Sequence, residues 1–170
     1  MSPRLAIVVM GVAGSGKSSL GAALAARLGI DFVDGDALHG QANVAKMRAG
    51  IPLDDADRWP WLDRVGTVLA DAEAYPQGVI VACSALKRAY RDRVRKSAGD
   101  CRFLYLDLSM EEAARRVGGR AGHFMPTSLV VDQFAILERP ATDETDAITL
   151  DATRPLDRLV EDTAALLAAA

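Results

Sequence analysis

The sequence predicts an α/β protein in which one sheet of five parallel strands is flanked by helices on both faces. Two observations predict this class, and a third predicts a single domain. Short β-branched runs alternate with longer segments of helical periodicity along the chain, which is the pattern of a parallel sheet covered by helices. Several short runs are apolar on both faces, as buried parallel strands are. The 170 residues contain no repeat, low-complexity tract or linker, so residues 1–170 are expected to form a single domain.

The predicted strands are residues Leu5–Met10, 31–33, 79–83, Arg102–Asp107 and 147–150. The predicted helices are residues Lys17–Leu28, 54–73, 84–96, 110–117 and 127–138, with a final helix after Pro155. In the first helix, Leu20, Leu24 and Leu28 recur at helical spacing, and glycine follows as the C-cap. In the segment after the third strand, Ser84 is the predicted N-cap. Most of the arginines there are expected to form a solvated basic face.

Composition excludes several classes of function. The net charge of −3 argues against a general nucleic-acid or membrane-surface binder. Cys83 and Cys101 have neither metal-site spacing nor a disulfide framework, so they are predicted to be buried thiols in a reducing compartment. No apolar run approaches the length of a membrane span, and the first is too short for a signal peptide. The sequence therefore predicts a cytoplasmic protein.

The break after the first strand reads "GVAGSGKSS" and matches G-x-x-x-x-G-K-[ST] without a mismatch. Glycines let backbone N–H groups surround a polyphosphate, and the following helix adds its positive end. Lys17 would reach the β- and γ-phosphates, and the Ser18 hydroxyl would bind Mg²⁺. The absence of an N-K-x-D tetrad favours ATP over GTP. The predicted nucleotide-binding residues of this loop are Gly11, Val12, Ala13, Gly14, Ser15, Gly16, Lys17, Ser18 and Ser19.

Ligands of such sheets bind beyond the carboxyl ends of the strands, and the second strand ends there in Asp34-Gly35-Asp36. One carboxylate could hold Mg²⁺ through water, and the other could orient a substrate hydroxyl or accept its proton. A solvated Asp-Gly turn is the alternative. Arg58 lies among carboxylates and tryptophans, which suits either a surface ion pair or a bidentate grip on a substrate carboxylate.

The segment "RRVGGRAGHFMP" follows the fourth strand and its helix. A glycine-hinged, arginine-bearing segment suits a mobile lid, expected at about residues 117–127, although an ordinary polar loop is the alternative. Arg116 and Arg120 would then stabilise charge on the transferring phosphoryl group. The loop after the last strand would lie beside the adenine base, with Thr153, Arg154 and Pro155 as candidates.

Taken together, these blocks resemble the small bacterial-type gluconokinases, the thermoresistant gluconokinase family of P-loop small-molecule kinases. The specific blocks are "DGDALHGQANVAKMRAGIPLDDADRWPWL" and "ACSALKRAYRDRVR", joined by "GHF" and "ERPATDETD". The resemblance implies a P-loop kinase fold with a mobile lid. It also implies ATP-dependent phosphorylation of D-gluconate on O6, with ATP and Mg²⁺ as cofactors. Relatives are often dimers, so a homodimer is a further expectation.

The resemblance also implies roles for individual residues. The implied catalytic residues are Lys17, Asp36, Arg116 and Arg120. The implied gluconate contacts are Asp36, His39, Arg58, Lys87, His123 and Gln133. The implied metal-site residues are Ser18 and Asp34. Two alternatives stay open: a kinase for a shikimate-like hydroxy acid or a nucleoside monophosphate, and a non-catalytic ATP-binding sensor.

Overall fold

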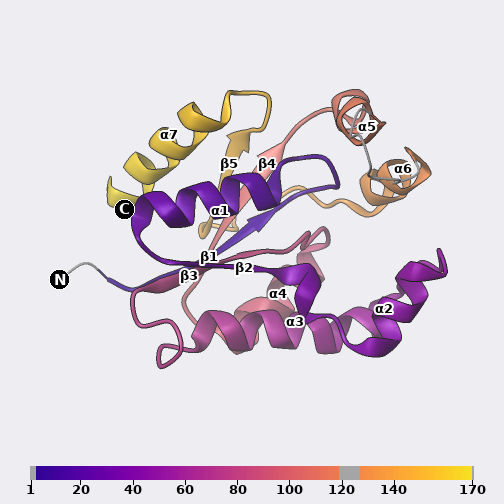
Figure 1. The fold of residues 1–170 in the computed structure, drawn as a ribbon, viewed down its shortest axis with the longest axis horizontal. Coiled ribbons are helices and arrows are strands. Elements are labelled where there is room, and N and C mark those ends of the chain that lie inside the picture. The colour runs from indigo at the N-terminus through magenta and orange to yellow at the C-terminus, as the bar shows by residue number, and fades with distance from the viewer. Residues whose placement is uncertain (1–2, 119–126, 170) are drawn as a thin grey trace.

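The computed structural model describes residues 3–118 and 127–169. A five-stranded sheet forms its centre, in the order β2-β3-β1-β4-β5, and every neighbouring pair of strands is parallel (Figure 1). The strands are β1 Leu5–Met10, β2 Asp31–Asp34, β3 Gly78–Ala82, β4 Arg102–Asp107 and β5 Ala147–Asp151. The predicted fold class and the five predicted strands are therefore confirmed, with ends that differ by a residue or so.

Helices cover both faces of the sheet (Figure 1). The α-helices are α1 Lys17–Leu28, α2 Gln41–Arg48, α3 Asp55–Ala70, α4 Arg88–Ala98, α5 Met110–Gly118, α6 Thr127–Ile136 and α7 Leu156–Ala169, and η1 Gly35–Leu38 is a 3₁₀-helix. One face packs against α1 and α7, and the other packs against α3 and α4. At the end where β1 enters the glycine-rich loop, α2 lies on one side and α5 and α6 lie on the other.

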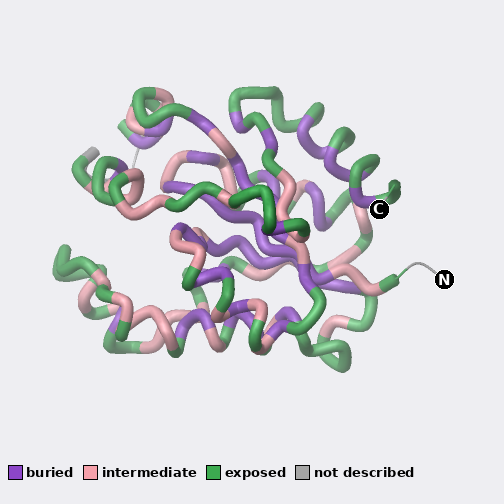
Figure 2. Tube along the Cα trace, turned by 180° about the vertical axis from the view of Figure 1, so that it is seen from behind, coloured by how far each residue is buried: buried purple, intermediate pink, exposed green. Residues whose placement is uncertain are grey.

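The central strand explains why the strands are apolar throughout. Along β1, Ile7 and Val9 join the core under α1 and α7, whereas Val8 and Met10 join the core over α3 and α4. All four side chains are fully buried. The tube coloured by burial shows the same pattern across the sheet, where the inner strands are buried along most of their length (Figure 2). Alternating residues thus supply two cores, as a sheet covered on both faces requires.

Two helix boundaries differ from those predicted by three residues or more. Ser84 is not the N-cap, because α4 begins only at Arg88 and its N-cap is Lys87. The Ser84 carbonyl instead accepts a hydrogen bond from the N–H of Gly11 at 3.2 Å, and Ala85 has a left-handed φ of 45° that interrupts a helix. The helix predicted over 54–73 ends at Ala70.

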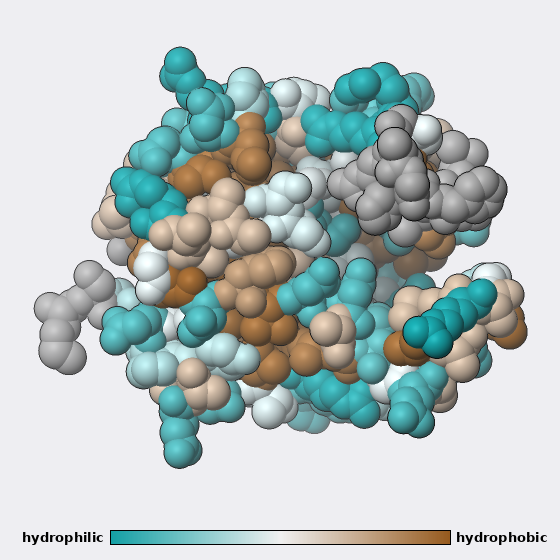
Figure 3. Space-filling view, in the orientation of Figure 1, coloured by the Kyte–Doolittle hydropathy of each residue, from teal (hydrophilic) through white to brown (hydrophobic). Residues whose placement is uncertain are grey.

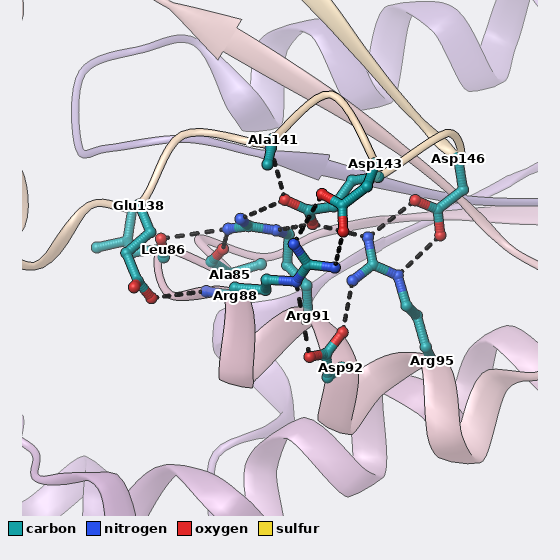
Figure 4. Close-up of polar contacts among 11 residues, drawn as sticks. Ala85, Leu86, Arg88, Arg91, Asp92, Arg95, Glu138, Ala141, Asp143 and Asp146 are labelled. Atoms are coloured by element: carbon teal, nitrogen blue, oxygen red, sulfur yellow. Dashed lines mark hydrogen bonds and ion pairs between the residues drawn. The ribbon is translucent and has the colours of Figure 1, made fainter.

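The expected solvated basic face is wrong for Arg91, which is fully buried on α4. Its guanidinium makes a bidentate ion pair with Glu144, with contacts of 2.7 and 3.0 Å, and also donates to the carbonyls of Ala85 and Leu86. Figure 4 shows Arg91 and Arg95 extending from α4 toward the segment before β5. This buried network therefore joins the loop after β3 to the chain that enters β5.

Neither α2 nor η1 was predicted from the sequence. Only one residue of α2, Asn43, is buried, so the helix carries little of the apolar periodicity that identifies helices. In the space-filling view α2 projects from one side of the molecule (Figure 3). Within the described residues, no helix combines the length and apolarity that crossing a membrane requires.

Candidate active site

The glycine-rich loop follows β1 and uses its glycines where no other residue fits. Gly11, Gly14 and Gly16 have φ values of 150°, 81° and 93°, which disfavour side chains. A Cβ on Gly11 would lie 2.8 Å from Ser15 Oγ, and a Cβ on Gly14 would lie 2.9 Å from the Ala113 carbonyl. The loop therefore keeps its concave shape only with glycine at these positions.

The loop has the features that a polyphosphate needs. Gly16 is the N-cap of α1 and supplies no side-chain cap, so the first N–H groups of the helix remain available for an anion. Ser15 Oγ is buried and has no hydrogen-bond partner among the described residues. Lys17 Nζ lies over the loop, 3.0 Å from the Val12 carbonyl. These donors fit the phosphates of a nucleotide.

A pocket of about 460 Å³ adjoins this loop. It is lined by Gly14, Ser15, Gly16, Ser19, Leu20, Leu106, Arg115, Arg116, Ala152, Arg154, Leu156 and Leu159. Apolar leucines and loop backbone together suit a nucleotide base and its phosphates. Of the predicted adenine-side residues, Arg154 lies on the wall. Thr153 and Pro155 are not among the lining residues, and the Thr153 hydroxyl donates to Asp151 at 2.6 Å.

Arg116 is fixed at the wall of this pocket. Its guanidinium contacts Glu112 at 3.1 Å, the Ala152 carbonyl at 2.8 Å and the Gly14 carbonyl at 3.5 Å. The hydrogen bonds from Arg115 and Arg116 lower the pKa of the Glu112 carboxyl to about 2. Arg116 thus joins α5, the glycine-rich loop and the loop after β5, and it carries positive charge beside the expected phosphates.

The Asp34-Gly35-Asp36 segment is rigidly placed at the end of β2. Gly35 packs so closely on β3 that a Cβ would lie 2.2 Å from the Ala82 carbonyl, and Trp61 Nε1 donates to the Gly35 carbonyl at 2.8 Å. Asp34 caps η1 by accepting from the Asp36 N–H at 3.0 Å. Among the described residues, no group of three or more carboxylates, histidines and cysteines forms a metal cluster. Any Mg²⁺ here would need oxygen atoms from the nucleotide or water as well.

Electrostatics connect the two halves of the site. Burial raises the pKa of the Cys83 thiol, just after β3, to about 12, and the charges of both Lys17 and Asp36 act on it. Gly35, next to Asp36, packs against Ala82 and Cys83 at the end of β3. Burial also lowers the pKa of His39, an effect that Asp36 opposes and Arg58 reinforces. His39 ends η1, and its backbone N–H donates to the Asp36 carbonyl at 3.4 Å.

The orientation of His39 is set by its neighbours. Its ring stacks on Trp61 with centroids 4.2 Å apart and an interplanar angle of 17°. Asn43 Nδ2 lies 3.1 Å from Nδ1 of His39 and donates to the Asp57 carbonyl at 2.9 Å. This explains the otherwise polar α2: its buried asparagine holds the histidine that follows η1.

Arg58 and Lys87 meet at the far end of the site. Lys87 Nζ lies 3.2 Å from Asp55 Oδ1, and Arg58 Nη1 lies 3.9 Å from the same oxygen. Arg58 Nη1 also contacts the Tyr90 hydroxyl at 2.9 Å. Sequence reasoning missed Asp55 and Tyr90, although Asp55 precedes Arg58, and Tyr90 follows Lys87, by three residues along a helical segment.

The remaining predicted residues fall in or near the segment between α5 and α6. Gln133, on α6, lies at the glycine-rich loop, where its Oε1 accepts from the Ala13 N–H at 2.6 Å. Arg120 and His123 lie outside the described residues, as does most of the lid expected at 117–127. The structure therefore brings Lys17, Asp36, His39, Arg58, Lys87, Arg116 and Gln133 to one end of the sheet.

Comparisons with known proteins show which family the chain resembles. Residues 7–140 match the family model of an AAA domain. The chain is 47% identical over 144 residues to the gluconokinase of Gluconobacter oxydans, covering 85% of this chain and 80% of that protein. It is 42% identical over 154 residues to the thermosensitive gluconokinase of Escherichia coli, covering 91% and 82%.

A solved structure supports the same assignment. The crystal structure of a gluconokinase from Sinorhizobium meliloti 1021 superposes with a TM-score of 0.87 and 47% identity, covering 98% of this chain and 94% of that one. On sequence and fold together, the chain belongs to the gluconokinase family.

Proposed function

We propose that this protein transfers the γ-phosphoryl group of ATP to the C6 hydroxyl of D-gluconate, giving 6-phospho-D-gluconate. The observation that carries the proposal is the succession of groups at the strand ends. The Gly11 N–H of the phosphate loop bonds to the Ser84 carbonyl just after β3, and Gly35, next to Asp36, packs on Ala82 at the end of the same strand. Lys87 follows three residues after Ser84 and contacts Asp55, as Arg58 does. The phosphate loop, the acceptor carboxylate and the two cations thus lie around the end of β3. A six-carbon acid with a terminal hydroxyl has matching ends.

The donor side is proposed to hold ATP through the glycine-rich loop, whose N–H groups and α1 N-terminus favour phosphate oxygens. Lys17 and Arg116 place positive charge beside the transferring group, where charge stabilisation contributes most to phosphoryl transfer. Ser18 and Asp34 are the proposed Mg²⁺-site residues, and the ion would neutralise phosphate charge there. Arg120 keeps its proposed role as a second lid arginine.

On the acceptor side, Asp36 is proposed to accept a hydrogen bond from the C6 hydroxyl and to orient it toward the donor. His39, held by Trp61 and Asn43, would contact the hydroxyl groups of the acid. Arg58 and Lys87 would bind the distant carboxylate. His123 and Gln133 remain proposed contacts, and Gln133 lies close enough to the loop to meet the phosphoryl group.

The proposed function is tested by assaying ATP consumption with one acceptor at a time: D-gluconate, shikimate and a nucleoside monophosphate. We expect turnover with gluconate and a phosphorus NMR signal of a phosphate ester on C6. Turnover with shikimate or the nucleotide alone would favour another small-molecule kinase. Tight ATP binding without transfer to any acceptor would favour a sensor.

Two further proposals follow from the family. A homodimer is tested by light scattering on the purified protein, and a cytoplasmic location by fractionation of the source cells. The proposed reaction depends on neither the homodimer nor the location.

A further inference from the structure

Four side chains form a compact cluster at the end of the site opposite the glycine-rich loop. Asp55 and Arg58 come from α3, and Lys87 and Tyr90 come from the beginning of α4. Their contacts are Tyr90 Oη to Asp55 Oδ1 at 2.5 Å, Arg58 Nη1 to Tyr90 Oη at 2.9 Å, and Lys87 Nζ to Asp55 Oδ1 at 3.2 Å. We call these four residues the distal cluster.

The hydrogen bonds of the distal cluster have a fixed direction. A guanidinium can only donate, so the Tyr90 oxygen accepts from Arg58. The single proton of the Tyr90 hydroxyl is then donated to the Asp55 carboxylate. Burial and the bond to Asp55 raise the pKa of the Tyr90 hydroxyl, which keeps that proton in place at neutral pH. Asp55, Tyr90 and Arg58 consequently form a chain of oriented hydrogen bonds.

Tyr90 is the rigid member of this chain. Its side chain is 2% exposed and meets the Trp59 ring edge-on with centroids 5.7 Å apart. The Arg58 guanidinium and the Lys87 ammonium lie 5.4 and 5.5 Å from the centre of the Tyr90 ring, within the range of cation–π attraction. One buried ring thus fixes the positions of two cations.

The distal cluster carries a net positive charge. Arg58 and Lys87 contribute two positive charges and Asp55 contributes one negative charge. Within the described residues, Arg58 makes one side-chain hydrogen bond, to Tyr90, so its other N–H groups can meet a ligand. A monoanionic acid would bring the cluster to neutrality, whereas a neutral polyol of the same length would not.

We propose that Tyr90 and Asp55 are positioning residues that give this site its selectivity for a carboxylate, because the Tyr90 hydroxyl, held by Asp55, orients Arg58 for a bidentate grip on the acid end of the substrate. The proposal rests on the proposed function. Bidentate arginine–carboxylate pairs depend strongly on orientation. Loss of the tyrosine hydroxyl should therefore weaken binding of the acid without changing the donor side.

The test compares Tyr90→Phe with the wild-type protein, using D-gluconate and D-glucitol, the polyol that carries a CH₂OH group in place of the carboxylate. We expect the KM for gluconate to rise about tenfold, the loss of one charge-assisted hydrogen bond, while kcat and the KM for ATP change little. The inhibition constant of glucitol, measured as a competitor of gluconate, should stay the same.

Tyr105→Phe is the matched control. Tyr105 on β4 is equally buried, at 2% exposure, and its hydroxyl donates to Asp107 at 3.3 Å. Its loss should leave the KM for gluconate unchanged. An equal weakening of gluconate and glucitol in Tyr90→Phe, or an unchanged KM for gluconate, would overturn the proposal.

Two Asp55 variants test the other end of the hydrogen-bond chain. They leave the buried core unchanged, because the Asp55 side chain is 46% exposed. Asp55→Asn keeps an oxygen that accepts the Tyr90 proton, whereas Asp55→Ala does not. We expect Asp55→Ala to raise the KM for gluconate about as much as Tyr90→Phe and Asp55→Asn to raise it less. Equal effects of both substitutions would contradict the oriented chain. If wild-type protein fails to phosphorylate gluconate, the proposed function fails instead, which separates the two outcomes.

Discussion

Tyr90 and Arg91 are neighbours on α4, yet they serve two charged clusters of opposite character. Arg91 is fully buried, and its guanidinium is satisfied by Glu144 and by two backbone carbonyls (Figure 4). Tyr90 faces Arg58, which is 23% exposed and makes one side-chain hydrogen bond within the described part of the chain. A buried arginine whose guanidinium is hydrogen-bonded within the protein stabilises the fold. A partly exposed arginine with one such hydrogen bond keeps N–H groups that can bind a substrate.

The two clusters also depend on each other. Arg91 donates to the carbonyls of Ala85 and Leu86, immediately before Lys87 of the distal cluster. Glu138, from the chain after α6, accepts from the Arg88 N–H at 2.9 Å at the start of α4. The buried network therefore supports the loop from which the distal cluster is built. Variants should still separate a stability role from a binding role.

The largest effect is expected from Arg91→Met. The substitution removes the bidentate partner of the buried Glu144 and leaves it with Arg95 and the Ala141 N–H, so we expect a loss of about 3 kcal/mol of unfolding free energy, the lower end for a broken buried ion pair. The KM for gluconate of the folded fraction should change less than threefold. Urea unfolding and steady-state kinetics at a temperature where the variant is folded measure the two quantities.

Arg27→Met is the control for this variant, because Arg27 pairs with Glu161 on the surface, where the two side chains are 52% and 61% exposed. Its unfolding midpoint should match that of the wild type within error. If Arg91→Met were equally harmless, the buried network would not stabilise the fold.

The next effect is a dependence of stability on pH. Burial alone would raise the pKa of the Glu144 carboxyl, but the hydrogen bonds from Arg91 and Arg95 outweigh it and lower the pKa to about 2. Because the folded pKa lies below the unfolded one, the stabilisation is complete above about pH 5 and is lost as the pH falls toward 2. Urea midpoints of the wild type and Glu144→Gln should therefore converge as the pH falls from 5.5 to 3.

Glu161→Gln provides the comparison for that series, since its midpoint should follow the wild type at every pH. A constant gap between wild type and Glu144→Gln across the range would contradict the ionised state of Glu144.

Arg58→Lys should have the smallest effect on the free energy of unfolding. In contrast to Arg91→Met, it should weaken the binding of gluconate and leave stability unchanged. Lysine keeps the charge but loses the planar fork, so we expect the KM for gluconate to rise about tenfold with an unchanged unfolding midpoint. Arg93→Lys is the matched control, because Arg93, on α4, likewise contacts a residue of the other helix, in its case as a bidentate pair with Asp63 of α3. A change in stability but not in KM would make Arg58 an architectural residue like Arg91.

The sequence predicted what depends on local pattern. The five strands followed from their apolar runs. The phosphate loop followed from a motif whose glycines have positive φ values, and at Gly11 and Gly14 a Cβ would also be too close to its neighbours. Ser84 was wrongly predicted as a cap because its carbonyl bonds to Gly11, which is distant in sequence. Tertiary contacts of this kind override a local preference.

The charged clusters were harder to predict from the sequence for the same reason. Arg91 resembles any arginine of a basic helix, and its partner Glu144 lies 53 residues away. Asp55 and Tyr90 are separated by 35 residues and carry no motif. Arg58 was identified as a candidate, but only the fold shows that Tyr90 holds it.

The central claim is that the acceptor hydroxyl meets Asp36 at the junction of the two halves of the site. Asp36→Asn tests it most directly, because the amide keeps the size of the side chain and removes the charge that orients or deprotonates the hydroxyl. We expect kcat with gluconate to fall by about 100-fold or more while ATP binding, measured by calorimetry, changes little. A variant with near-normal kcat would contradict the role of Asp36 and the placement of the acceptor derived from it.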